Sequence, residues 1–215
     1  MRTRPGLMAC LAVTAIAYSV MHHIGFGLAW LGTVGGTRWV DWIDIGTPYA
    51  VLLPAAMALY AGDAGRATWA LYLVGAITYV EGHGIHLAAN SVGNDAPGEV
   101  AHLWDEVVGH YLWYAGVFLV FAALARVLLR TSVTPGTPAY LLAAITGVTV
   151  ATNALEGGTA LMCIGVAAAF LAWARRAGPG PGRLILAAAV PALVLLLAYG
   201  LWQRGFPQPT EIGLL

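Results

Sequence analysis

The sequence predicts an all-α fold: a polytopic integral membrane protein, in which residues 1–215 form one bundle of seven transmembrane helices. Three observations predict this fold. Hydrophobic residues make up 60% of the chain and charged residues only 9%, whereas soluble domains are about 25% charged. Apolar runs recur at the length of about 20 residues that carries a helix across a bilayer. Segments rich in glycine and proline, which interrupt helices, separate these runs.

Each span is defined by an apolar run and by the breaker that precedes or follows it. The predicted spans, in chain order, are 7–31, 43–61, 68–91, 102–129, 139–156, 159–175 and 184–202. The breakers between them, in the same order, are GTVGGTR, GDAGRA, GNDAPGE, TSVTPGTP, the Gly157–Gly158 pair and GPGPGR. The first run continues past the small residues that resemble a cleavage site, so we expect an uncleaved first helix.

Arginine placement predicts the orientation. With a cytoplasmic N-terminus, all basic residues except Arg38 and Arg204 fall in cytoplasmic segments. Because cytoplasmic loops are enriched in basic residues, we expect an odd number of spans, an N-terminus in the cytoplasm and an extracytoplasmic C-terminus. The bacterial plasma membrane is the expected location.

Composition also excludes two classes of function. The basic residues are all arginines, so the chain has no lysine to form the Schiff base of a retinal protein. The formal net charge is zero, which gives nucleic acid no electrostatic attraction. Cys10 and Cys163 lie in apolar runs and are expected to be small buried side chains.

Ionisable residues gather toward the extracytoplasmic ends of the spans. This group contains every acidic residue except Asp63, and it contains all six histidines: His22, His23, His83, His86, His102 and His110. Charged groups inside a bilayer are costly, face the bundle interior and mark functional sites. We therefore expect a polar site near the outer surface.

The third span carries the stretch VEGHGIHLAANS, residues 80–91. Steps of three and four residues place His83, His86 and Asn90 on one face of a helix. Glu81 lies about 160° away from His83 on a regular helix, at 100° per residue. The neighbouring glycines could loosen this turn and let Glu81 approach the same face.

The fourth span carries a second polar strip. His102, Glu106 and His110 follow one another at intervals of four residues. Asp105 lies on another side of a regular helix from His110 and is kept as a candidate. The loop between the third and fourth spans is short, which makes them antiparallel neighbours whose polar strips can face each other.

These residues predict a metal site. Imidazole and carboxylate groups suit zinc best, and also iron or copper. The candidate ligands are His83, His86 and His110, with His102, His22 and His23 as further candidates. The candidate catalytic acids and bases are Glu81, Asp105, Glu106 and Glu156. The candidate substrate-binding residues are Asn90, Ser91 and Asn153.

The favoured function is a membrane-embedded, metal-dependent hydrolase that acts on a membrane lipid or lipid-like small molecule. A carboxylate beside the metal would take a proton from metal-bound water. One alternative is a metal-free acid–base isomerase or cyclase of an isoprenoid or sterol-like substrate. Others are an oxygenase, a haem or copper electron carrier, with His86 and His110 as the haem pair, and a transporter.

Seven spans, a cytoplasmic N-terminus and polar residues inside the bundle loosely resemble one known superfamily. It comprises the seven-span metal-dependent hydrolases, which include alkaline ceramidases and the adiponectin- and progestin-type receptors. That family places an HxxxH pair in its last span, whereas 184–202 contains no histidine here. No residue role is therefore carried over, and the resemblance adds only modest support for a hydrolase.

Overall fold

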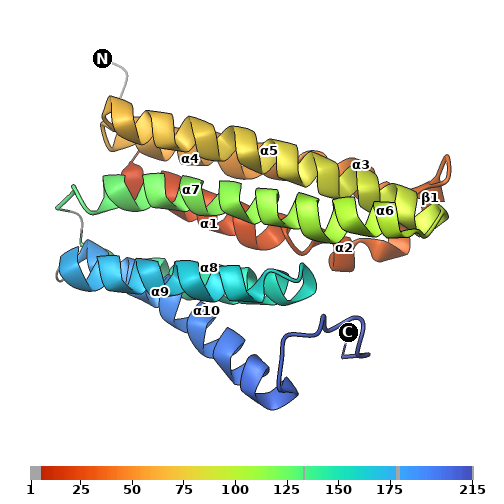
Figure 1. Cartoon of the computed structure of the whole chain (residues 1–215). Helices are drawn as coiled ribbons and strands as arrows, with labels where there is room; N and C mark the ends of the chain where they lie inside the picture. Colours follow the sequence, from red (N-terminus) through yellow and green to blue (C-terminus); the bar gives the residue numbers. More distant parts are fainter. Residues whose placement is uncertain (1–5, 133, 178–179, 215) are drawn as a thin grey trace.

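Helices make up nearly all the regular structure in the computed structural model, which describes residues 6–132, 134–177 and 180–214. The long helices are α1 (Leu7–Met21), α4 (Thr47–Ala61), α5 (Arg66–Asp95), α7 (His110–Leu128), α8 (Thr137–Glu156), α9 (Ala160–Ala177) and α10 (Pro181–Gln203). Each overlaps one predicted span, and successive long helices run in opposite directions (Figure 1). The predicted helical architecture is confirmed.

Short elements fill the connections at the end of the bundle where the polar residues gather. They are α2 (Ile24–Gly27), the 3₁₀ turn η1 (Ala29–Leu31), α3 (Trp39–Asp44), α6 (Glu99–His102) and the π-helix η2 (Leu103–Gly109). Strands β1 (Thr33–Val34) and β2 (Thr37–Arg38) form a small antiparallel hairpin with Thr33 opposite Arg38. The span expected at 7–31 is therefore not one helix, because α1 ends at Met21.

Five helical segments of the described chain are long and apolar enough to cross a membrane. They are Trp39–Ala61, Glu99–Leu128, Thr137–Glu156, Ala160–Ala177 and Pro181–Gln203. Helix α1 has only 15 residues, and α5, with 30 residues, lacks the required apolar composition. The structure thus supports a protein with membrane-spanning helices, while the seven-span count stays a prediction.

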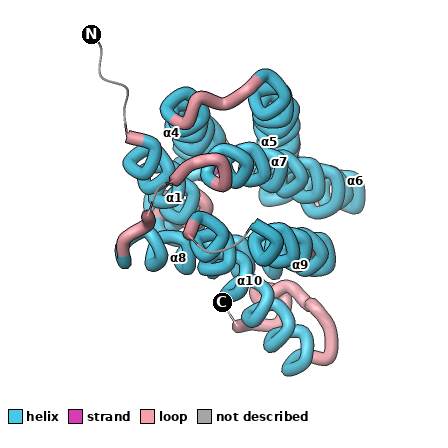
Figure 2. The backbone as a smooth tube through the Cα atoms, turned by 90° about the vertical axis from the view of Figure 1, so that its left-hand side faces the viewer, coloured by secondary structure: helices cyan, strands magenta, loops and turns pink. Residues whose placement is uncertain are grey.

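The long helices form two groups. Viewed along the bundle, α4 and α5 lie on one side, α8, α9 and α10 lie on the other, and α1 and α7 lie between them (Figure 2). Helix α10 crosses α8 and α9 obliquely (Figure 1). The largest fully buried side chains include Tyr18, Tyr79 and Tyr114, which place an aromatic core between the groups.

Helices α5 and α7 approach closely because glycines line their contact. These glycines are Gly75 and Gly82 on α5, Gly109 at the end of η2 and Gly116 on α7. A Cβ added at Gly109 would lie only 2.8 Å from the Cα atom of His86, closer than real Cβ contacts allow. Small residues let membrane helices pack backbone against backbone. This packing brings the histidines of α5 against the start of α7.

Candidate metal site

Three side chains from one helical hairpin form a group that could hold a metal ion. They are His86 on α5, Asp105 on η2 and His110 at the start of α7, and their ligand atoms all lie within 4.8 Å of one another. His86 Nδ1 donates a hydrogen bond to Asp105 Oδ1 at 2.5 Å. The side chains of His86, Asp105 and His110 are 15%, 14% and 8% exposed, so the group is largely shielded from solvent.

The π-helix η2 brings Asp105 into this group. On a regular α-helix, residues five positions apart point about 140° away from each other. In a π-helix the hydrogen bonds join residues i and i+5, so Asp105 and His110 come onto one side. The expectation that Asp105 lies on another side from His110 is therefore overturned. Single π turns inside α-helices are frequently found at functional sites.

Glu106 lies beside His110, as the predicted strip requires. Its Oε2 atom is 3.1 Å from His110 Nδ1. The same oxygen accepts a hydrogen bond from Gln208 Nε2 at 2.6 Å. Glu106 thus contacts both the metal-ligand group and the segment after α10.

Trp113 lies at the centre of the histidines. Its ring centroid is 5.0 Å from that of His86 and 5.7 Å from that of His110. On another side it is 4.7 Å from the ring of His83 and 5.2 Å from that of His22. The indole therefore separates the candidate ligand group from a second, deeper polar group.

His83 belongs to this second group and not to the ligand group. Its Nε2 atom is 3.3 Å from Asp44 Oδ1. Asp44 also accepts a hydrogen bond from Thr47 at 2.5 Å. The ring centroids of His83 and His86 are 6.2 Å apart. The sequence predicted His83 as a principal ligand, but the structure places it beside the partly buried carboxylate of Asp44 instead.

His22 and His23 lie away from the ligand group. His22 Nε2 and the Tyr79 hydroxyl form a buried hydrogen bond of 2.8 Å. His23 Nδ1 lies 2.7 Å from the Ser19 carbonyl oxygen, and its Nε2 lies 3.2 Å from Thr152 Oγ1. Both histidines therefore tie helices together in this structure.

Two further candidates, Glu81 and His102, are exposed. Helix α5 is regular around Glu81, so its neighbouring glycines do not turn this carboxylate toward the histidines. His102 begins the predicted strip but is outside the ligand group. Neither residue is brought to the site.

The remaining polar candidates have partners of their own. Ser91 Oγ donates to Asp41 at 2.9 Å. Asn153 Nδ2 donates to a carbonyl of its own helix at 2.8 Å, and Asn90 accepts from its helical neighbour Asn94 at 3.1 Å. Glu156 accepts from Thr210 Oγ1 at 2.8 Å, while its Oε1 atom is buried with no hydrogen-bond partner among the described residues.

Sequence reasoning missed three residues around the site. These residues are Asp44, Trp113 and Gln208, none of which is among the candidate site residues predicted from the sequence. The spacing of Trp113, three residues after His110, was the one available signal for it, since it puts both on one helical face. Gln208 follows His110 by nearly a hundred residues, and only the tertiary structure brings it close to Glu106.

The donor set is chemically suited to a metal ion. Two imidazoles and one carboxylate match the His₂–carboxylate ligands of catalytic zinc sites, which keep a position open for water. The same set matches the two-histidine, one-carboxylate triad of non-haem iron oxygenases. Comparisons of the chain with protein-family models, curated proteins and solved structures find no match, so the functional argument depends on this geometry.

Proposed function

We propose that the protein is an integral membrane enzyme that holds a divalent metal ion through His86, Asp105 and His110. One observation carries the proposal: three largely buried groups of the right chemistry lie within 4.8 Å of one another inside an apolar helical protein. Such groups are costly to bury unless they are paired or bind a ligand.

We further propose that all seven long helices cross the membrane, with the N-terminus in the cytoplasm. Helix α5 supports this despite its composition. It buries His83 against the bundle, whereas Leu73, Val74 and Ile77 are 54%, 56% and 66% exposed. An apolar outer face and a polar inner face are what a bundle helix shows when its outside contacts lipid.

A bound zinc ion would act as a Lewis acid and lower the pKa of bound water. Glu106 is the nearest further carboxylate to His110, and its recorded contacts with Gln208 and His110 both involve Oε2. We assign Glu106 a place beside the His110 ring, where its carboxylate would orient that ring toward a bound ion. His86 Nδ1 and Asp105 Oδ1 are already in contact, and these two side chains together with His110 would hold the ion.

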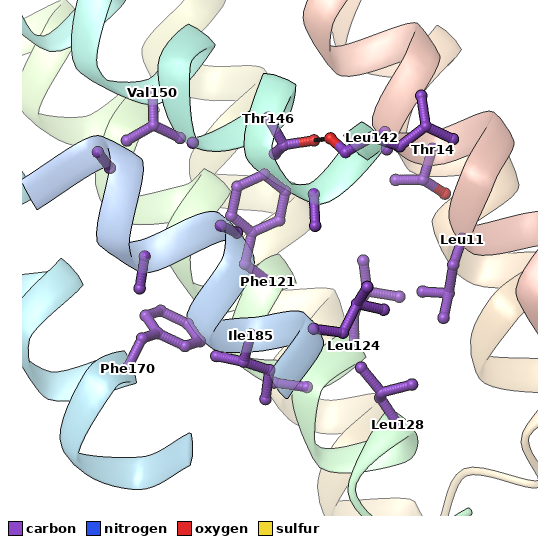
Figure 3. A pocket seen from close by; sticks show the side chains of 18 of the residues that line it. Leu11, Thr14, Phe121, Leu124, Leu128, Leu142, Thr146, Val150, Phe170 and Ile185 are labelled. Carbon is purple, nitrogen blue, oxygen red and sulfur yellow. Dashed lines mark hydrogen bonds between the residues drawn. The ribbon is translucent and has the colours of Figure 1, made fainter. Parts of the chain in front are cut away.

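A lipid-like substrate is supported by an apolar cavity of about 200 Å³ between α1, α7, α8, α9 and α10 (Figure 3). The hydroxyls of Thr14 and Thr146 in its wall donate to carbonyls of their own helices at 2.8 and 2.9 Å. Phe118, in the cavity wall, follows His110 by eight residues on α7, or about 12 Å at 1.5 Å per residue. The apolar wall of the cavity suits a hydrocarbon chain, which is the part of a lipid that would occupy it.

The separation of the His86 and His110 rings disfavours the alternative in which these two histidines bind a haem. The ring centroids of His86 and His110 are 4.4 Å apart with an angle of 32° between the planes. Axial histidines approach iron from opposite faces of a flat macrocycle, which does not fit between rings at this separation. A non-haem iron oxygenase remains the second candidate, because its ligand triad has the same composition.

Metal analysis tests the proposal. Protein purified in mild detergent should retain about one ion per chain, as a single mononuclear site requires. His86→Ala and His110→Ala should each abolish this retention because each removes a ligand. His102→Ala is the matched control, since that histidine lies one helical segment earlier and is exposed. Wild-type protein without metal, or both mutants with full metal content, would contradict the assignment; the element found decides between zinc and iron.

A further inference from the structure

The chain turns back on itself after α10. Arg204 adopts a left-handed conformation with φ of 56° and ends the helix. Gly205 N–H donates to the carbonyl of Gly200 at 3.0 Å. The Tyr199 hydroxyl donates to the carbonyl of Pro207 at 2.8 Å. These contacts direct residues 207–210, here called the strap, back toward the bundle (Figure 1).

The strap reaches two carboxylates at the polar end of the bundle. Gln208 Nε2 donates to Glu106 Oε2 at 2.6 Å, and Thr210 Oγ1 donates to Glu156 Oε2 at 2.8 Å. Both donors are neutral, so each carboxylate is hydrogen-bonded without acquiring a cationic partner. Hydrogen bonds to an ionised acceptor are roughly twice as strong as those between neutral groups.

Gln208 sets the position of Glu106 more firmly than His110 does. Glu106 Oε2 lies 3.1 Å from His110 Nδ1, but His110 Nδ1 has no partner in hydrogen-bonding geometry among the described residues. The hydrogen bond from Gln208 to the same oxygen is shorter, at 2.6 Å. The carboxylate is therefore held near the histidine from the side of the strap.

We infer that Gln208 is a positioning residue of the metal site. It holds Glu106 beside His110 Nδ1, where the carboxylate would accept a hydrogen bond from this nitrogen when the other ring nitrogen binds an ion. Such outer partners orient metal-binding histidines, and their loss typically weakens metal binding 10- to 100-fold. This inference rests on the proposed metal site, and it adds a residue from the far end of the chain to it.

The first test compares Gln208→Ala with Gln203→Ala in the full-length protein. Gln203 is the last residue of α10 and serves as the control. Competition with a chelator for Zn²⁺ should show binding weakened about 10- to 100-fold in Gln208→Ala, with Gln203→Ala like wild type. The visible spectrum of the Co²⁺-loaded protein should change in Gln208→Ala alone. Unchanged Zn²⁺ affinity in Gln208→Ala would overturn the inference.

A paired exchange separates positioning from simple attachment of the strap. Glu106→Gln combined with Gln208→Glu restores an amide–carboxylate hydrogen bond with the two roles reversed. The strap should dock again, so that trypsin cleaves at the exposed Arg204 as slowly as in the wild-type protein. Zn²⁺ binding should nevertheless stay weak, because position 106 in η2 no longer carries the carboxylate. Wild-type Zn²⁺ affinity in the exchanged protein would show that Gln208 only tethers the strap.

The outcomes also separate this inference from the proposed function. Wild-type protein that binds Zn²⁺ while Gln208→Ala binds it equally well would remove the positioning role and leave the metal site standing. Wild-type protein that does not bind Zn²⁺, Co²⁺ or iron would remove both.

Discussion

Asp44 and His83 form a pair whose burial makes it important for stability. Their side chains are 19% and 2% exposed, and Asp44 Oδ1 lies 3.3 Å from His83 Nε2. Asp44 also accepts a hydrogen bond from the buried Thr47 hydroxyl, and a buried polar group that loses its partner costs about 1–3 kcal/mol. This pair is separate from the metal-ligand group, so stability and metal binding should respond differently to its removal.

Asp44→Asn should therefore lower the free energy of unfolding by about 1–3 kcal/mol and leave the metal content unchanged. The variant keeps the shape of the side chain and removes its charge. Thermal unfolding in detergent, followed by elemental analysis, measures both quantities. Asp95→Asn is the control because Asp95 is exposed at the end of α5. Loss of metal in Asp44→Asn would contradict this separation and would support His83 as a metal ligand, as the sequence predicted.

At the level of single residues, the sequence predicted part of the site. His86 and His110 followed from the cost of burying imidazole in a membrane helix. Asp105 joins the site because of a π turn. A prediction based on 3.6 residues per turn cannot show how such a turn changes the direction of a side chain. Gln208 is a neutral side chain in a terminal segment, and only its tertiary contact reveals its position.

At the level of elements, the contact between α5 and α7 positions the site. Gly82 faces the backbone of Trp113, and Gly109 faces the backbone of His86. Side chains at these positions would force the two helices apart. The ring of His86 would then move away from that of His110, whose centroid is 4.4 Å away.

Gly82→Ala should accordingly destabilise the protein by about 1–3 kcal/mol, as overpacking in a tight interior does, and weaken metal binding. Gly84→Ala is a matched control two residues along the same helix, because an added Cβ there meets nothing within 4 Å. Thermal unfolding and chelator competition measure the two effects. Equal behaviour of the two variants would show that the helices can separate without cost to the site.

The sequence was most informative about the long helices. Apolar runs of nearly 20 residues between glycine- and proline-rich breakers correspond to α4, α8, α9 and α10 to within a few residues. The prediction of one continuous helix over 7–31 was wrong, because α1 ends at Met21. Glycines at 25 and 27 lower helix propensity there, and the apolar composition continues through α2 and η1, so hydropathy alone did not show the break.

At the level of the whole molecule, the orientation in the membrane can be measured by labelling. Cys10 and Cys163 are buried, so an added cysteine should be the main reactive thiol. We expect Asp95→Cys to react with an impermeant maleimide in intact cells, and Gly136→Cys to react only after permeabilisation. Both positions are exposed and lie on either side of α7. Reversed labelling would invert the topology, and labelling of both from outside would contradict a span between them.

The candidate ligands occupy one short stretch of chain, from His86 to His110. Written as a pattern, the donors read H-x18-D-x4-H. The four residues between Asp105 and His110 bring these two side chains together only while η2 keeps its π-helical winding. A homologue that shares this chemistry should therefore conserve the length of the 103–109 segment as strictly as the donors themselves. Alignments of future relatives can use that gap-free block as a signature of the site.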